Sequence, residues 1–429
     1  MKHKGWQQSE SAAKRLKKRY RRERRLKAAG ILAIGLALGV LMLLLGSVIA
    51  RGYPAFVKTE ISLEVTFVQK LIDPRSTGEM AHLAKGKYGK VLRRALFKYY
   101  PEVTERAERR KLTRLVSKAA RFELREMILD HPEWVGTTQR VWLTAASDVD
   151  MLTKGSMPRD VPETERRLND RQVGWIDRLD AAGSLRTIFN FDFFTGSDSR
   201  EPELAGIGGA LAGSFWTLLI TLVLAFPLGV AAAVYLQEFA PKNRFTDFVE
   251  VNINNLAAVP SIVFGLLGLA IFIQVFELPR STAIVGGLTL MLMTLPTIII
   301  ATRAALAAVP PSIREAAHGI GASPVQVASH HVLPLALPGI MTGTIIGMAR
   351  ALGETAPLLM IGMVAFIVDI PSAPFDSATA LPVQIFLWAD SPERGFDEKM
   401  SAAIIVLLAF LMIMNALAVF LRRRFETRW

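Results

Sequence analysis

Long uncharged apolar stretches constrain this chain more than any other feature. Residues 28–50 are 23 consecutive uncharged positions between Lys27 and Arg51. As an α-helix they would measure about 34 Å, enough to cross the roughly 30 Å hydrocarbon core of a bilayer. A cleaved signal peptide is the alternative, but this stretch is longer than the usual apolar part of a signal peptide. We therefore expect residues 28–50 to form the first transmembrane helix.

Five further stretches have the length and apolarity of membrane spans. They are residues 213–236, 251–276, 281–302, 335–368 and 402–421. Stretches of this kind fit a bilayer better than the core of a soluble protein. The sequence therefore predicts an α-helical polytopic membrane protein with about six transmembrane helices.

Charge sets the expected orientation of these spans. Residues 1–27 carry 12 Lys and Arg against 2 Asp and Glu, and four arginines follow the last span. Basic flanks stay in the cytoplasm, and two cytoplasmic termini agree with an even number of spans. The formal charge of +13 comes mostly from the first 27 residues, which abut an apolar stretch. We therefore expect membrane lipid as a partner and no nucleic acid, in a multi-pass protein of the bacterial inner membrane.

Residues 51–203 differ from the rest because about a third of them are charged, with 27 Lys and Arg and 23 Asp and Glu. Leu63, Val65 and Phe67 alternate as in a strand, whereas apolar residues within 104–129 recur at helical spacing. We expect an inserted α+β extracytoplasmic domain here. The chain has no cysteine, and His82 and His131 lack metal-ligand spacing, so we expect no disulfide, metal site or catalytic group.

The segment of residues 310–338, named here the 310–338 loop, should lie in the cytoplasm between the fourth and fifth spans. Pro311 suits the first turn of a helix over residues 312–317, and Gly319 and Gly321 permit a sharp reversal. Ala316 and Ala317 would leave a small face that a partner protein can approach closely. Glu315 would supply one charge to that partner.

A second short helix should follow the reversal. Ser323 before Pro324 has the pattern of an N-cap and first turn. This helix should run to about His331, and Pro334 should stop it. The 310–338 loop is thus predicted to hold two short helices at an angle.

The 310–338 loop resembles the EAA loop of ABC-importer permeases. That motif is Glu-Ala-Ala, three residues, Gly, nine residues, and Ile-x-Leu-Pro, and its positions here are Glu315, Ala316, Ala317, Gly321, His331, Leu333 and Pro334. The sequence departs from the motif at His331, where Ile is usual. The resemblance implies an ABC type I importer core whose loop docks into a cleft of an ATP-hydrolysing subunit. No Gly-x-x-x-x-Gly-Lys-Ser/Thr motif is present, so we expect no cofactor here and an ATPase on another chain.

Arg350 and Glu354 lie inside the predicted fifth span. Either charge alone would cost about 2.5–3.5 kcal/mol at the centre of a membrane helix. Four residues apart, they share a helix face and can pair. Two interpretations stay open, a polar strip on a transport path for an oxyanion and a buried structural ion pair.

Three runs resemble phosphate-importer permeases of the PstA type, and the resemblance covers about residues 205–429. They are Arg350-Ala-Leu-Gly-Glu-Thr-Ala-Pro-Leu-Leu359, Pro227-Leu-Gly-Val-Ala-Ala-Ala-Val-Tyr235 and Leu256-Ala-Ala-Val-Pro-Ser-Ile-Val-Phe-Gly265. Pro260 would break its helix, as happens along transport paths and at ordinary kinks. Ser261 could donate a hydrogen bond to an oxyanion or to its own backbone. The candidate path residues are Arg350, Glu354, Thr355, Pro260 and Ser261.

The resemblance implies a non-catalytic permease subunit of a phosphate importer. Its expected partners are a second permease, two copies of an ATP-binding subunit and an extracytoplasmic phosphate-binding protein. Alternatives are a permease for sulfate, molybdate or another solute, and a membrane-anchored sensor or scaffold. The expected organisation is a basic segment (1–27), a first transmembrane helix (28–50), an extracytoplasmic domain (51–203) that touches the binding protein or partner permease, and a core with five transmembrane helices (204–429).

Overall fold

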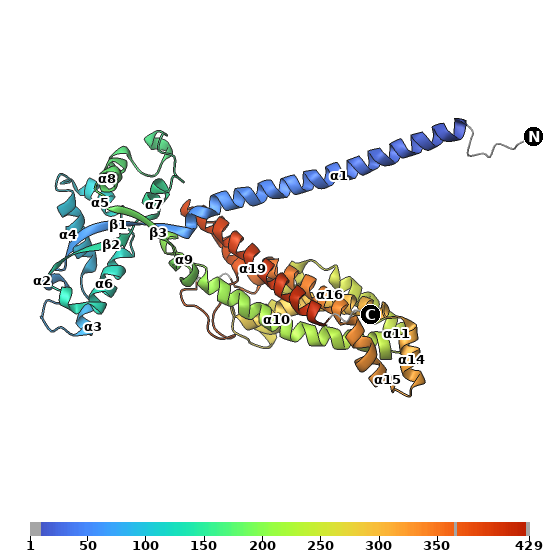
Figure 1. Ribbon diagram of the computed structural model, residues 1–429. Helices are drawn as coiled ribbons and strands as arrows, with labels where there is room; N and C mark the ends of the chain where they lie inside the picture. Colours follow the sequence, from blue (N-terminus) through green and yellow to red (C-terminus); the bar gives the residue numbers. More distant parts are fainter. Residues whose placement is uncertain (1–9, 364–366, 426–429) are drawn as a thin grey trace, which may run out of the picture. The chain divides into compact units, whose positions relative to one another are not determined.

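The computed structural model describes residues 10–363 and 367–425 (Figure 1). Within these ranges, five helices are long and apolar enough to cross a membrane, and a sixth span is added if one bent helix pair is counted as one. The chain divides into two compact units, one ending at Arg51 and the other beginning at Gly52.

The first unit is essentially one helix, α1 (Glu10–Gly52). It joins the basic N-terminal residues and the apolar stretch 28–50 without a break, and Glu23 pairs with Lys27 one turn later at 2.7 Å. Its apolar part, residues 28–50, carries no charged side chain on any face. A helix that is apolar on every side fits a hydrocarbon environment.

The second unit begins with an α+β region (residues 53–207) built on a three-stranded sheet. Its strands are β1 (Val57–Thr66), β2 (Thr138–Thr144) and β3 (Leu185–Phe189), in the antiparallel order β2-β1-β3. β1 is central, and Leu63 pairs with Val141. The alternation of Leu63 and Val65 correctly predicted a strand, and residues 59–63 of β1 are buried on both of its faces.

Eight α-helices surround this sheet and its core. They are α2 (Gln69–Ile72), α3 (Met80–Leu83), α4 (Tyr88–Tyr99), α5 (Arg106–Thr113), α6 (Ala120–Asp130), α7 (Ser147–Thr153), α8 (Asp170–Ala181) and α9 (Asp192–Thr195). The helical spacing within 104–129 corresponds to two helices, because the chain between them leaves the helix to meet β2. There, Ser117 N donates to Thr144 O at 2.9 Å, and Val116 forms a bridge with Ala145.

The remaining residues form a helical region (residues 208–425). Its helices are α10 (Gly208–Val234), α11 (Arg244–Ala257), α12 (Ser261–Gly268), α13 (Ala283–Ala307), α14 (Pro311–Gly319), α15 (Pro324–Gln326), α16 (Leu333–Gly353), α17 (Ala356–Met360), α18 (Leu381–Ala389) and α19 (Gly395–Phe425). Wider π-helical turns follow α10 at Tyr235–Phe239 and α12 at Leu269–Val275.

Glycines allow α13 and α16 to approach closely. Gly339, Gly343 and Gly347 recur every four residues on α16 and face α13. A Cβ atom on Gly343 would lie 2.1 Å from the Ala301 Cβ, and one on Gly339 would lie 2.7 Å from the Ala305 Cβ. Small residues at this spacing hold membrane helices together through close backbone packing.

The predicted span over 251–276 is interrupted at Pro260, as expected, but its first helix starts before residue 251. α11 begins earlier, at Arg244, where the Asn243 side chain accepts hydrogen bonds from Phe245 N and Thr246 N. α11 and the helix that starts at Ser261 meet at an angle of 102°. Pro260 causes the break because it has no N–H group and disfavours helical geometry in the residue before it.

The predicted span over 335–368 is also shorter than expected. α16 ends at Gly353, Glu354 has an extended backbone, and Pro357 opens the short helix α17. Residues 364–366 lie outside the described residues. The last span starts earlier than predicted, because α19 begins at Gly395 rather than near residue 402.

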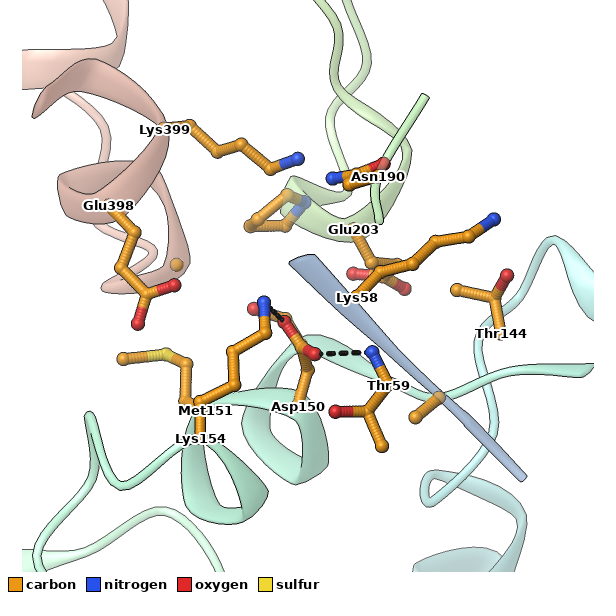
Figure 2. Close-up of a pocket in the computed structure, with 14 residues that line it drawn as sticks. Lys58, Thr59, Thr144, Asp150, Met151, Lys154, Asn190, Glu203, Glu398 and Lys399 are labelled. Atoms are coloured by element: carbon orange, nitrogen blue, oxygen red, sulfur yellow. Dashed lines mark hydrogen bonds and ion pairs between the residues drawn. The ribbon is translucent and has the colours of Figure 1, made fainter. Parts of the chain in front are cut away.

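The first turn of α19 is buried against the α+β region (Figure 2). Glu398 is 8% exposed and Lys399 is 6% exposed. Lys399 Nζ lies 4.9 Å from the centre of the Phe193 ring, and a Cβ on Gly395 would overlap the Ser147 hydroxyl. We call this contact zone the junction.

Charged groups of the α+β region complete the junction. Asp150 Oδ1 accepts a hydrogen bond from Thr59 N at 2.7 Å, and Asp150 Oδ2 pairs with Lys154 Nζ. Lys58 and Glu203 also line it (Figure 2). Buried charges need partners of this kind because isolated charges are costly away from water.

Glu203 gives the junction a predicted pH dependence. Burial raises the pKa of Glu203, although Ser117 Oγ donates a hydrogen bond to its Oε1 at 2.8 Å. A carboxyl group whose pKa is higher in the folded protein than in the unfolded one favours folding only while it is protonated. Its contribution to the free energy of unfolding is fully present below the unfolded-state pKa and is lost as the pH rises through the folded-state pKa. We expect Glu203→Gln, which keeps the acceptor oxygen, to raise the melting temperature at pH 8. The gain should vanish towards the ordinary glutamate pKa of about 4.3.

Thermal melts of the purified protein between pH 4 and 8 measure this effect. Glu201→Gln is the matched control, because the neighbouring Glu201 is less buried and pairs with Lys118. A constant stability loss for Glu203→Gln at every pH would contradict the prediction.

Candidate functional site

The 310–338 loop folds as an elbow at its first helix. α14 (Pro311–Gly319) has Pro311 in its first turn, as predicted. Gly321 adopts φ +88°, a left-handed conformation that glycine tolerates best, and thereby reverses the chain. Gly319 instead lies within α14.

Ser323 starts the second helical segment of the elbow. The Ser323 hydroxyl accepts from Gln326 N at 3.4 Å, and Ser323 N donates to Gln326 Oε1 at 2.9 Å. These two bonds form a capping box that fixes the start of α15 (Pro324–Gln326). The predicted N-cap is therefore confirmed.

Pro334 does not stop this segment, and that expectation is wrong. A π-helical turn, Val327–Val332, joins α15 to α16, in which Leu333 and Pro334 form the first turn. The wider turn accommodates a proline that lacks an N–H donor. Residues 324–353 therefore run as one helical segment.

The elbow exposes a different surface from the predicted pair of alanines. Glu315 and Ala316 are exposed, but Ala317 is only 3% exposed and packs in a core cluster with Leu306 and Val327. Sequence reasoning missed Ile320 and Val325, which are 81% and 64% exposed. Exposed apolar residues beside a charge are typical of an interaction surface.

His331, the departure from the motif, is half-buried at the base of the elbow. It lines a surface hollow with Ile313, Pro334 and Pro338. The His331 imidazole thus lies in the wall of the hollow. The turn of the elbow is formed elsewhere, by Gly321 and Ser323.

Arg314 anchors the elbow to two other helices. Its Nη2 and Nε donate to Glu238 Oε1 and Oε2 at 2.8 and 3.2 Å, just after α10. Its guanidinium also donates to Leu306 O at 2.9 Å and Val309 O at 2.8 Å, at the end of α13. The last carbonyls of a helix lack intrahelical donors, so one arginine both caps α13 and holds the end of α10.

The candidate path residues on α16 form an ion pair. Arg350 Nε lies 3.3 Å from Glu354 Oε1, with side-chain exposures of 47% and 19%. Arg350 lies in the last turn of α16, within the helical stretch 324–353 that is long and apolar enough to cross a membrane, and Glu354 follows directly after it. The pairing predicted from their four-residue spacing is present.

Pro260 and Ser261 start α12, which packs closely on α17. A Cβ on Gly265 would lie 2.7 Å from Pro357 Cα. The structure therefore places α12 beside the segment that follows Thr355. In the described ranges, no hydrogen bond joins Ser261 to Arg350 or Glu354, and no group of three or more His, Asp and Glu could hold a metal ion.

Comparison of the sequence with known proteins identifies the family to which the chain belongs. Residues 225–428 match the binding-protein-dependent transport system inner membrane component, and residues 13–163 match a domain of unknown function. The chain is 33% identical over 259 residues to the phosphate transport system permease protein PstA of Mycobacterium leprae, a match that covers 58% of this chain and 83% of that protein. The PstA protein of Haemophilus influenzae is 30% identical over 53% of this chain and 79% of its own length. The chain belongs to the PstA-type family of ABC importer permeases.

Two further similarities were found. The probable ABC transporter permease protein YqgI of Bacillus subtilis is 36% identical, over 40% of this chain and 58% of its own length. Among solved structures, a chain of the inward-facing MetNI methionine ABC transporter aligns at 18% identity with a TM-score of 0.42, over 52% of this chain and 95% of that chain.

Arg314→Met should loosen the elbow of the permease. The substitution keeps the aliphatic packing but leaves Glu238 and the Val309 carbonyl without the donor that Arg314 supplies, at a local cost of about 1.5–3 kcal/mol. Amide hydrogen exchange across residues 311–326 should then accelerate by about tenfold or more.

Arg303→Met is the matched control for this measurement. Arg303 pairs with Glu250 at 2.6 Å and has the same side-chain exposure as Arg314, 23%, but it joins α13 to α11. Equal acceleration of the elbow in both variants would show that Arg314 has no special role in holding it.

Proposed function

We propose that this chain is the permease subunit of an ATP-driven importer of inorganic phosphate. It would form the pathway with a second permease and take its driving motion from two copies of a separate ATP-binding subunit. An extracytoplasmic phosphate-binding protein would deliver the ion, and this chain would be non-catalytic. The anchored elbow, with Glu315 and Ile320 exposed, is the observation that carries the proposal.

The elbow is suited to transmitting motion from a partner. Its second segment continues into α16 without a break over residues 324–353. Its first segment is fixed through Arg314 to the ends of α10 and α13. A partner that displaces Glu315 and Ile320 would therefore act on three long helices together.

The proposed orientation follows from charge. We place residues 1–27, the 310–338 loop and the basic C-terminal end in the cytoplasm of a bacterial inner membrane. The segment 51–203 would then be an extracytoplasmic domain inserted between the first span and the core at 204–429. This arrangement puts the elbow on the side where ATP is available.

An oxyanion substrate is supported by the names of the relatives and by Arg350. The Arg350 guanidinium is half exposed and held by Glu354, which leaves donors for an anion. Thr355, Pro260 and Ser261 belong to neighbouring elements and are the other proposed path residues. Sulfate and molybdate share the tetrahedral shape of phosphate, so the substrate needs a direct test.

Radiolabelled uptake in cells with and without the gene tests the substrate. We expect deletion to remove most high-affinity phosphate uptake and to leave sulfate and molybdate uptake unchanged, with recovery on complementation. Loss of sulfate or molybdate uptake with intact phosphate uptake would reject phosphate as the substrate.

Substitutions in the elbow test its partner. Glu315→Arg with Ile320→Asp should abolish co-purification of the ATPase and reduce uptake about tenfold or more, because charge reversal and a buried unpaired carboxylate oppose docking. Glu126→Arg, the same reversal at an exposed site on α6, should leave both unchanged. Undiminished ATPase association in the elbow variant would instead favour a sensor or scaffold.

A further inference from the structure

Positive charge is concentrated on one part of the α+β region. Residues 85–98 contain six Lys and Arg and no Asp or Glu, although residues 51–203 together hold nearly equal numbers of both signs. This cluster continues onto the next helix with Arg106, Arg109 and Arg110. The local charge is therefore a feature of one surface and not of the whole region.

The cations converge on a groove between α4 and α5. α4 buries Tyr88, Val91 and Leu96 on one face and directs its cations outward on the other. The groove is a hollow of about 860 Å³ whose basic lining residues are Lys90, Arg93, Arg94, Lys98, Arg106, Arg109 and Arg110. We call it the α4–α5 groove.

Two of these arginines are held in place through their Nε atoms. Arg93 Nε donates to Gly89 O at 3.0 Å, and Arg109 Nε donates to Val103 O at 2.9 Å. The Arg109 guanidinium also stacks over Phe97, with Cζ 4.7 Å from the ring centre. Their terminal Nη groups have no recorded partner in the described part of the chain, so each can present a fork to an anion.

Within the described residues no carboxylate lines the groove, although one lining cation, Lys98, pairs with Glu64 outside it at 3.6 Å. Glu108 is turned to Lys111 at 3.1 Å and Arg171 at 3.5 Å. Over the described residues, Arg94, Arg106 and Arg110 make no side-chain hydrogen bond or ion pair. Like charges on both walls repel one another, and an anion between them would relieve that repulsion.

We propose that the α4–α5 groove binds anions that carry two or more phosphate groups. Guanidinium forks match phosphate oxygens, and several convergent cations favour a ligand with several linked phosphates over a single ion. The hollow has the size of small-molecule sites, roughly 300–1,000 Å³. Its concave form suits a narrow anionic chain or head group better than the surface of a folded protein.

Two kinds of ligand carry several linked phosphate groups: a free condensed phosphate, and a membrane lipid with two phosphates in its head group. The inference goes beyond the proposed transport function, because it does not depend on which solute crosses the membrane. Failure of one leaves the other standing.

Binding is tested on the full-length chain in nanodiscs of zwitterionic lipid. Tripolyphosphate is titrated by calorimetry, and a second arm measures association with vesicles that contain or lack cardiolipin. We expect saturable binding that weakens with salt in at least one arm. Arg94→Gln/Arg106→Gln/Arg110→Gln should weaken it at least about tenfold.

Lys70→Gln/Arg75→Gln/Arg121→Gln is the matched control, with the same charge change at exposed sites outside the groove. It should stay within about twofold of the unmodified protein. Melting curves confirm that both variants fold. Absence of binding in both arms, equal loss in both variants, or equally tight binding of polyglutamate would overturn the proposal.

Discussion

Hydrocarbon offers no hydrogen-bond partner to a peptide group, and the helical region is arranged around that constraint. Pro227, Pro296 and Pro338 lie within long helices, where each removes a backbone donor. Threonine hydroxyl groups in these helices likewise bond to backbone carbonyls: Thr342 Oγ1 donates to Pro338 O at 2.8 Å, and Thr221 Oγ1 donates to Gly287 O of the neighbouring helix α13 at 3.1 Å. At the end of α13 the donor is Arg314, so a structural requirement at a helix end also fixes the elbow in place.

Because Arg314 belongs to the elbow and bonds to the ends of two long helices, it ties the elbow to those helices. Arg314 could cap the α13 carbonyls from many positions, but its bond to Glu238 adds the end of α10. On the other side, Ala317, Val327 and Ile340 pack in a single apolar cluster that joins both halves of the elbow to α16. Since packed interiors deform little, motion that the proposed partner applied to the elbow would be passed to these helices and not absorbed in the loop.

The sequence predicted features that depend on local rules and missed those that depend on packing. Pro311 at a helix start and Ser323 as an N-cap follow from backbone donors alone, and both are present. The prediction that Pro334 ends the second helix was wrong because a π-helical turn packed against the core accommodates a proline that would disrupt a regular α-helix. The apolar pattern of the sequence could not reveal that α16 ends at Gly353, because apolar side chains continue past this residue. Arg314 was missed because its partner Glu238 is 76 residues away in the chain.

The buried charged residues at the junction also connect a long helix to another part of the fold. Glu398 and Lys399 begin α19, a 31-residue helix whose other end reaches α16, where Arg422 Nη1 donates to Thr342 Oγ1 at 3.1 Å. Lys399 Nζ lies 4.9 Å from the centre of the Phe193 ring, a cation–π contact that fixes this part of α19 against the α+β region. Close packing of Ala402 against Gly52 leaves no room for a side chain there. The start of α19 is therefore packed tightly on the α+β region through Gly395 and on Gly52 through Ala402, so a displacement of that region would act directly on α19.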